Sequence, residues 1–218
     1  MIMKTQAMTI KNMAVVIAAL ATLLFSSCTI HVGDKKSNEK TTAKQFDLKD
    51  FNKIQISGEA DIDFAQDSIY KVEASTTTEG FEQMELTVKD STLCLSRKGN
   101  GKFVLKNGNS VKLRITAPDL KAIHVSGACE FDSYKINTSE FSAHVSGAGE
   151  FNIKNLTAEK VDFSISGAGE VEAHLIDCGD VEVSVSGAGD IELSGNARSF
   201  TKHTSGVASI NTNGLEIK

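Results

Sequence analysis

The chain repeats nearly the same five residues at a spacing of 20 residues. The copies read SGACE, SGAGE, SGAGE and SGAGD, and they occupy residues 126–130, 146–150, 166–170 and 186–190. A further copy, TSGVASI at 204–210, comes one residue early, and a distant copy, SGEADI, lies at 57–62. A fixed period in this range is typical of arrays in which each unit packs against the next one.

Within one unit, apolar and polar residues alternate on both sides of the glycine-rich pentapeptide. In VDFSISGAGEVEAHL the apolar positions are Val161, Phe163 and Ile165 before the pentapeptide, and Val171, Ala173 and Leu175 after it. A period of two on both sides of a turn is typical of two strands that each direct one face to a core. Apart from a short turn near EGFEQM at 79–84, the sequence has no convincing helical stripe.

Two architectures accommodate strands at this period. In a β-solenoid each repeat forms one coil, and equivalent residues stack about 4.8 Å apart. In an antiparallel meander each repeat forms a hairpin pair, which needs alternation but no constant Ser-Gly-Ala column. Stacking requires every tight corner to be built in the same way, with glycine where a Cβ would clash. The constant column favours the solenoid.

The repeat therefore predicts an all-β solenoid with about 20 residues per coil over 117–218. Residues 46–116 alternate without a clean period, and we interpret them as an irregular β region that continues the solenoid and closes one end. The corner residues are interpreted as structural, and they are Ser126, Gly127, Ser146, Gly147, Ser166, Gly167, Ser186 and Gly187.

The first 27 residues have the pattern of a secretory signal. Lys4 and Lys11 accompany the apolar run MAVVIAALATLLF, which is shorter than the roughly 20 residues of a membrane-spanning helix. LFSSC then resembles the bacterial lipobox, although Phe25 stands where that motif prefers leucine. We predict a signal peptide at 1–27 and lipidation of Cys28, so that a lipid anchor replaces a transmembrane helix. An ordinary secreted protein is the alternative.

Residues 28–45 are polar and charged, and they predict a flexible tether. Removal of residues 1–27 would change the formal net charge from −5 to −7, because Lys4 and Lys11 are the only charged residues removed. An acidic body does not fit nucleic acid or electrostatic docking to anionic lipid head groups. We therefore predict contact with the membrane through the lipid alone and no nucleic-acid partner.

An acidic residue follows every corner except the last. If the coils stack, these carboxylates lie near one another and repel, unless lysines or cations intervene. A ladder of divalent cations is therefore conceivable, but the pattern differs from the nine-residue calcium-binding repeat. We interpret the column as solvated turn acids and predict neither a metal nor a cofactor. The weak metal candidates are Asp61, Glu130, Glu150, Glu170 and Asp190.

Histidines and cysteines give no stronger metal pattern. His124 and His144 share the column two residues before the serine, and His203 joins it after the one-residue shift. Two imidazoles without a placed third ligand make a poor zinc site, so a surface pair is expected. The three cysteines of the domain, Cys94, Cys129 and Cys178, have no CxxC spacing and predict buried or half-buried apolar positions rather than disulfides.

The repeated serine does not have the pattern of a nucleophile. A catalytic serine needs one base and one orienting acid, placed once. Four equivalent serines beside glycines instead predict hydroxyls that satisfy backbone groups at the corners. A phosphate-binding loop is also excluded, because neither a Walker lysine nor a helix follows.

Three stretches carry a family resemblance. FDLKDFNKIQISGEADIDF at 46–64, APDLKAIHVSGA at 117–128 and the run of SGAGE corners resemble the putative autotransporter-adhesin head GIN domain family. The resemblance extends over 46–218 and implies a right-handed β-helix-like fold in an envelope protein of Gram-negative bacteria, often a lipoprotein. It implies little about activity, because a fold does not establish function. Cys129 departs from the corner glycine, and the last copy lacks its acid.

We therefore predict a non-enzymatic, lipid-anchored module of the cell envelope, at the outer membrane, that binds an unknown protein or polysaccharide through a long polar face. The chain has no tryptophan and only Tyr70 and Tyr134, which argues against the aromatic platforms of sugar-binding grooves. One alternative is a polysaccharide-acting enzyme, which needs acids or arginines clustered in a cleft. The other is a passive structural protein. The oligomeric state is not predicted.

Overall fold

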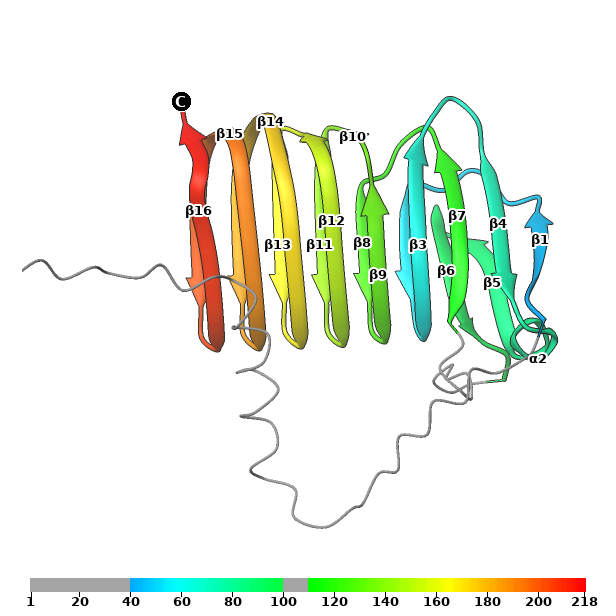
Figure 1. Ribbon diagram of the computed structural model, residues 1–218. Helices are drawn as coiled ribbons and strands as arrows, with labels where there is room; N and C mark the ends of the chain where they lie inside the picture. Colours follow the sequence, from blue (N-terminus) through cyan, green and yellow to red (C-terminus); the bar gives the residue numbers. More distant parts are fainter. Residues whose placement is uncertain (1–39, 100–109) are drawn as a thin grey trace, which may run out of the picture. The chain divides into compact units, whose positions relative to one another are not determined.

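The computed structural model describes residues 40–99 and 110–218; the predicted signal peptide and Cys28 lie outside these ranges. The chain forms a β-solenoid with about 20 residues per coil, in which the strands of successive coils lie side by side (Figure 1). The predicted all-β solenoid is thereby confirmed. No helix within the described ranges is long and apolar enough to cross a membrane.

The strands that precede each SG corner form a parallel sheet, which we call the pre-corner sheet. Its core strands are β2 (Lys53–Ile56), β8 (Ala122–Val125), β11 (Glu140–Val145), β13 (Lys160–Ile165) and the second halves of β14 (Ala168–Val185) and β15 (Ala188–Thr204). At the other side of β2, β6 (Thr92–Arg97) adds in parallel and β5 (Met84–Lys89) adds antiparallel to β6.

The strands that follow each corner form the post-corner sheet. Its parallel strands are β7 (Val111–Ala117), β3 (Glu59–Gln66), β9 (Ala128–Ser133), β12 (Ala148–Thr157), the first halves of β14 and β15, and β16 (Val207–Ile217). The antiparallel strands β4 (Lys71–Thr76) and β1 (Thr42–Phe46) extend it beyond β7. The two-residue strand β10 (Ile136–Asn137) pairs with β12. Because β14 and β15 run through both sheets, the two are joined.

The expected helical turn is present as α2 (Thr78–Gln83). The Thr77 hydroxyl caps it by accepting a hydrogen bond from the Gly80 backbone N–H at 3.1 Å. The sheet also begins earlier than the predicted end of the tether at residue 45. Backbone pairing with β4 fixes the polar sequence TAKQF, which carries no strong apolar signal of its own.

The stretch that we interpreted as irregular holds an ordinary coil in an unexpected place. β2 and β3 pair on one side with β8 and β9, and on the other with β6 and β7. In Figure 1 the cyan β3 accordingly lies between the green strands β9 and β7. The distant SGEADI copy is therefore in register with the array, since the Ala128 N–H donates to the Gly58 carbonyl at 2.8 Å. The rest of the stretch departs from the regular coils, because β4 pairs antiparallel with β7, β5 pairs antiparallel with β6, and α2 lies between β4 and β5 in the sequence.

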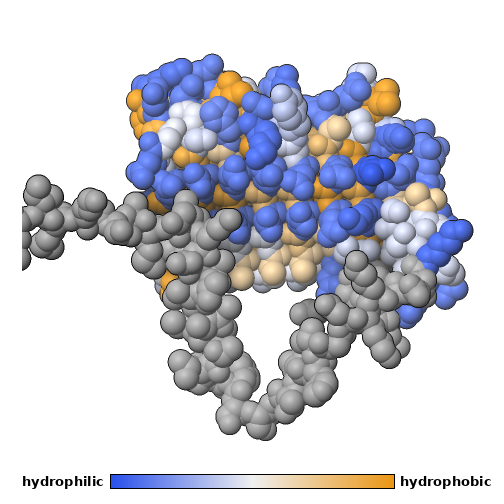
Figure 2. All heavy atoms as spheres, in the orientation of Figure 1, coloured by the Kyte–Doolittle hydropathy of each residue, from blue (hydrophilic) through white to orange (hydrophobic). Residues whose placement is uncertain are grey.

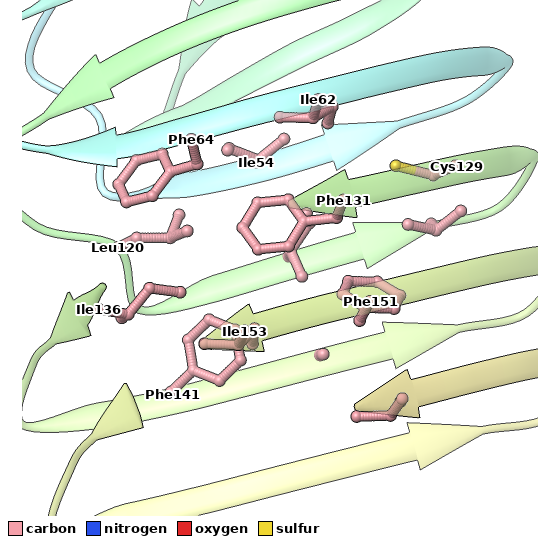
Figure 3. Close-up of a cluster of buried hydrophobic side chains, with 14 of the residues drawn as sticks. Ile54, Ile62, Phe64, Leu120, Cys129, Phe131, Ile136, Phe141, Phe151 and Ile153 are labelled. Carbon is pink, nitrogen blue, oxygen red and sulfur yellow. The ribbon is translucent and has the colours of Figure 1, made fainter. Parts of the chain in front are cut away.

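The core lies between the two sheets and consists of stacked apolar columns (Figure 3). Phe64, Phe131 and Phe151 follow one another on successive coils of the post-corner sheet, with ring centroids 6.3 Å and 5.7 Å apart. Burial of each such side chain contributes about 1.5–3 kcal/mol. Phe141 and Phe163 meet edge to face on the pre-corner side, at 6.1 Å.

The cysteines are buried or half-buried, as expected, and two of the three belong to this interior. Cys129 and Cys178 are buried, Cys94 is half-buried, and all three are free thiols. Burial, together with the nearby carboxylates of Asp61 and Glu130, raises the pKa of Cys129 to about 12. A thiol with so high a pKa stays protonated and is a poor nucleophile or metal ligand.

Candidate functional site

The SG corners stack with their backbones in close contact. A Cβ on Gly147 or Gly167 would lie 1.9 Å from the carbonyl oxygen of the glycine one coil earlier. Backbone hydrogen bonds hold this spacing, since the Ala148 N–H donates to the Gly127 carbonyl at 2.8 Å. Glycine is therefore required by the approach of neighbouring coils.

The corner serines bond to the same backbone. The hydroxyls of Ser126, Ser146 and Ser166 each donate to a carbonyl of the preceding coil at 3.3 Å. Each of these three hydroxyls is thus engaged with a main-chain oxygen.

The acidic residues form two columns on the outer face of the post-corner sheet. The first contains Asp61, Glu130, Glu150, Glu170 and Asp190, in register, with Lys112 beside Asp61 at 3.8 Å. The second contains Asp63, Asp132, Asn152, Glu172 and Glu192. On the face shown in Figure 2, hydrophilic side chains form rows that cross the stacked coils.

The acid columns behave as a repelling array. Desolvation raises the pKa of Glu130, and Asp61 and Glu150 on the neighbouring coils raise it further. Across residues 40–99 and 110–218, no group of three or more histidine, cysteine or acidic side chains has the arrangement of a metal site. The structure thus brings the candidate acids into register, without a geometry for one ion.

A groove runs along the outer face of the pre-corner sheet, next to the corners. It has a volume of about 830 Å³ and crosses the coils from Gln55 to Ser205. Its lining includes the corner serines and the column His124, His144, Ser164, Ser184 and His203. We call it the serine-histidine groove. The sequence placed these residues in columns, but the hollow itself arises because the small serines lie between larger histidines at both ends.

The charge of the groove differs from that of the acid columns. The described residues that line it include three histidines and Lys202 but no carboxylate. Acids are present only beside it: Asp162 accepts a hydrogen bond from the Ser164 hydroxyl at 2.8 Å, and Glu182 lies 3.8 Å from His203.

The predicted histidine pair is formed. The rings of His124 and His144 stack with centroids 4.9 Å apart. Burial lowers the pKa of His124, and the proximity of His144 and Lys53 lowers it further. The neutral form is therefore favoured at this end of the groove.

A second hollow lies on the outer face of the post-corner sheet, and sequence reasoning missed it. It has a volume of about 400 Å³. We call it the Tyr134 pocket, and its polar lining contains Asp63, Lys71, Arg114, Asp132, Tyr134, Asn152 and Lys154. These residues come from separate strands far apart in the sequence, so no local sequence motif predicts the pocket.

Arg198, which looks isolated in the sequence, bridges coils. It donates to Asp180 at 2.9 Å and to Glu159 at 3.4 Å. Its hydrogen bond, together with one from Ser199, lowers the pKa of Asp180. All three groups are exposed to solvent, so this clamp adds little stability and contributes no cleft.

Comparison with known proteins agrees with this architecture. A family model described as "Putative auto-transporter adhesin, head GIN domain" matches residues 50–218. The crystal structure of a putative adhesin from Bacteroides fragilis NCTC 9343 is similar at 19% identity and a TM-score of 0.50, and the match covers 79% of this chain and 97% of that one. At this identity the likeness supports the fold alone.

Two further crystal structures are similar at lower scores. A putative lipid binding protein from Parabacteroides distasonis ATCC 8503 has 16% identity and a TM-score of 0.47, with coverage of 80% of this chain and 97% of that one. A putative adhesin from Parabacteroides merdae ATCC 43184 has 15% identity and a TM-score of 0.46, with the same coverage. No curated protein sequence matches the chain significantly.

Proposed function

Because the chain belongs to the putative auto-transporter adhesin, head GIN domain family, we propose that it is a non-enzymatic, lipid-anchored binding module of the cell envelope whose ligand lies along the serine-histidine groove. Family membership confirms the resemblance noted at residues 46–64 and 117–128. The ligand is an extended polymer, either a protein segment or a polysaccharide.

The observation that carries this proposal is the continuity of the groove across stacked coils. Equivalent hydroxyls recur once per coil, about 4.8 Å apart, so that an extended chain lying along the axis meets the same chemistry at each step. Many weak contacts of this kind add to a useful affinity through multivalency. The absence of carboxylates from the described lining means that the groove accepts neutral or anionic polymers, whereas the acid columns would repel the anionic ones.

The residues that line the groove do not support the alternative of a polysaccharide-acting enzyme. Glycoside hydrolysis typically uses two carboxyl groups on opposite sides of the scissile bond. Among the described residues that line the groove there is neither a carboxylate nor an arginine. The two acid columns lie on the other sheet, where each carboxylate repeats its neighbour instead of taking a distinct role.

Location is tested by protease treatment of intact cells that produce the tagged full chain or its Cys28→Ala variant. We expect the wild type to fractionate with the outer membrane and to be digested without lysis, whereas Cys28→Ala leaves the membrane fraction. Protection of the wild type until lysis would place the domain inside the envelope, and adhesion to other cells or to surfaces would be abandoned.

Binding through the groove is tested with a pair of substitutions that fill it. Ser164→Trp with Ser184→Trp introduces two rings at adjacent outward positions, and Glu172→Trp with Glu192→Trp is the matched pair on the other sheet. The readout is adherence of intact cells to mucin-coated wells, together with cell-to-cell aggregation. We expect the serine pair to lower adherence about tenfold or more and the glutamate pair to leave it near the wild-type level.

Equal adherence of the two pairs would show that the groove is not the binding surface. If deletion of the whole gene changes detergent sensitivity but neither adherence nor aggregation, the passive structural alternative is correct.

A further inference from the structure

The Tyr134 pocket displays an aromatic ring on fixed backbone. Tyr134 follows β9 and is 78% exposed, which is unusual for so large an apolar surface. The Asn155 side chain donates a hydrogen bond to the Tyr134 carbonyl at 2.9 Å and so fixes this residue to β12. The chain has one other tyrosine, Tyr70, which packs against Phe51 with ring centroids 5.1 Å apart. Tyr134 is therefore the tyrosine available for a ligand.

The polar groups around this ring include both donors and acceptors. Asp132 and Asn152 are neighbours in register on adjacent coils. Lys154 contributes an ammonium group that lies 3.4 Å from Glu172. The Asn152 Oδ1 atom is buried and has no hydrogen-bond partner among the described residues. A sugar hydroxyl both donates and accepts, so it can bond to a carboxylate, an amide and an ammonium group at once.

We infer that the Tyr134 pocket binds a neutral sugar residue, whose ring packs on Tyr134 and whose hydroxyls bond to Asp132, Asn152 and Lys154. The volume of about 400 Å³ lies within the range of small-molecule sites. Tyrosine suits this role because it combines a large apolar face with a polar tip.

The charges of the pocket favour a neutral sugar because most of them are already paired. Two carboxylates, Asp63 and Asp132, line it together with three cations, Lys71, Arg114 and Lys154, and Lys154 lies 3.4 Å from Glu172. Arg114, the strongest potential partner for an anion, already pairs with Asp63 at 3.8 Å and with Glu73 at 3.6 Å. The site lies on the opposite sheet from the serine-histidine groove, so the two proposals stand independently. The inference departs from the expectation that two tyrosines are too few for sugar binding, since it rests on one exposed ring beside a polar pocket.

The test uses the full chain in mild detergent, with maltotriose, chitotriose and a galactotriose as neutral probes and trigalacturonic acid as the acidic probe. Because the chain has no tryptophan, its intrinsic emission comes from two tyrosines, one of which lies in the pocket. Titration calorimetry gives the Kd, and the change in tyrosine emission locates the ligand. We expect saturable binding of at least one neutral probe below about 10 mM and weaker binding of the acidic probe.

Variants separate a sugar site from a general effect on the fold. Tyr134→Ala should weaken binding about tenfold, the loss expected for one aromatic contact, and Asp132→Asn should also weaken it. Tyr134→Phe should retain most of it, since the ring remains. Tyr70→Phe should leave it unchanged, and the groove pair Ser164→Trp with Ser184→Trp shows whether the sugar binds in the groove instead. Matching unfolding temperatures would show that Tyr134→Ala is folded, as its exposure leads us to expect.

Three results would overturn the inference. They are the lack of saturable binding of all neutral probes, equal binding by the wild type and a folded Tyr134→Ala variant, and tighter binding of trigalacturonic acid than of the neutral probes. A loss of binding in the groove pair with none in Tyr134→Ala would instead assign the sugar to the groove.

Discussion

The two ends of the stack leave strand edges exposed and protect them in different ways. Beyond β7 and β6 the parallel sheets end on antiparallel strands, β4 and β1 on one sheet and β5 on the other. The outermost strand β1 is short and polar, and its Lys44 lies over the Phe81 ring of α2 at 4.2 Å. Short, charged edge strands resist pairing with another chain.

At the other end the described stack stops on parallel strands with polar residues in core columns. Ile123, Ala143, Phe163 and Val183 share one inward column, and Lys202 takes the same position in β15. Thr204 ends the neighbouring inward column in the same way. A lysine at this register position prevents another apolar coil from stacking, because its charge would then be buried without a partner.

This difference shows two routes to the same protection. Antiparallel strands require segments from elsewhere in the chain, and they leave the neighbouring core covered. Polar residues at the ends of the core columns need only local changes in sequence, and they leave Phe200, Ile210 and Leu215 partly exposed. We expect the coils near β16 to open more readily than those near β9, since stability in stacked repeats is largely a sum over neighbours.

The largest effect should come from the aromatic cluster of Phe64, Phe131 and Phe151. Phe131→Ala removes a ring that packs between Phe64 and Phe151, and it should lower the free energy of unfolding by about 3–5 kcal/mol. Phe200→Ala, near the polar end, should cost about 1 kcal/mol, because that side chain is only partly buried. Urea denaturation followed by circular dichroism measures both. Similar losses at the two sites would show that the two ends are equally well packed.

Alanine substitution of a corner glycine should also destabilise the middle of the stack more than the end at β16, although by a smaller amount. A Cβ at Gly167 or at Gly206 would lie 1.9 Å from a carbonyl oxygen of the preceding coil. Gly167 has described coils on both sides, so Gly167→Ala should cost about 3 kcal/mol. In Gly206→Ala the strand β16 can shift away, and the cost should be about 1 kcal/mol. The same denaturation measurement applies, and a larger loss at Gly206 would contradict the predicted mobility of that end.

Lys202→Val should alter association. The substitution extends the apolar column by one position and removes the charge at its end, so we expect end-to-end association that increases with protein concentration. Sedimentation equilibrium compares it with the wild type and with Lys160→Val, which removes a lysine from the outward face of β13. If Lys160→Val associates as strongly as Lys202→Val, loss of charge alone is responsible and Lys202 does not protect the edge.

The smallest effect concerns acid sensitivity near the histidine pair. Because the pKa of His124 is lowered from its ordinary value of 6.5, the unfolded state binds the proton more tightly than the folded state. Stability should therefore fall as the pH decreases below 6.5 towards the folded pKa. His124→Gln should reduce this loss in thermal unfolding between pH 7 and pH 5, whereas His203→Gln, whose neighbour is Glu182, should not. If thermal unfolding of His124→Gln depended on pH in the same way as that of the wild type, protonation of His124 would not be the cause of the lost stability.

The sequence alone determined the features that recur with its period. The constant glycine predicted stacked coils, and the close approach of Gly147 and Gly167 to the preceding corner is the physical reason. The same period placed Glu150 beside Glu170 and His124 beside His144, as the register confirms. The cysteines, too, were predicted as apolar positions from their spacing and count.

Only the tertiary structure decided what depends on segments distant in the sequence. The coil of β2 and β3 lies between β7 and β9, although its local sequence pattern does not predict which strands it pairs with. The Tyr134 pocket combines Asp63, Arg114 and Asn152 from three such strands. The physical reason is that closing a long loop costs only slightly more entropy than closing a short one. Local sequence therefore fixes the shape of a coil, while complementary packing between coils fixes their order.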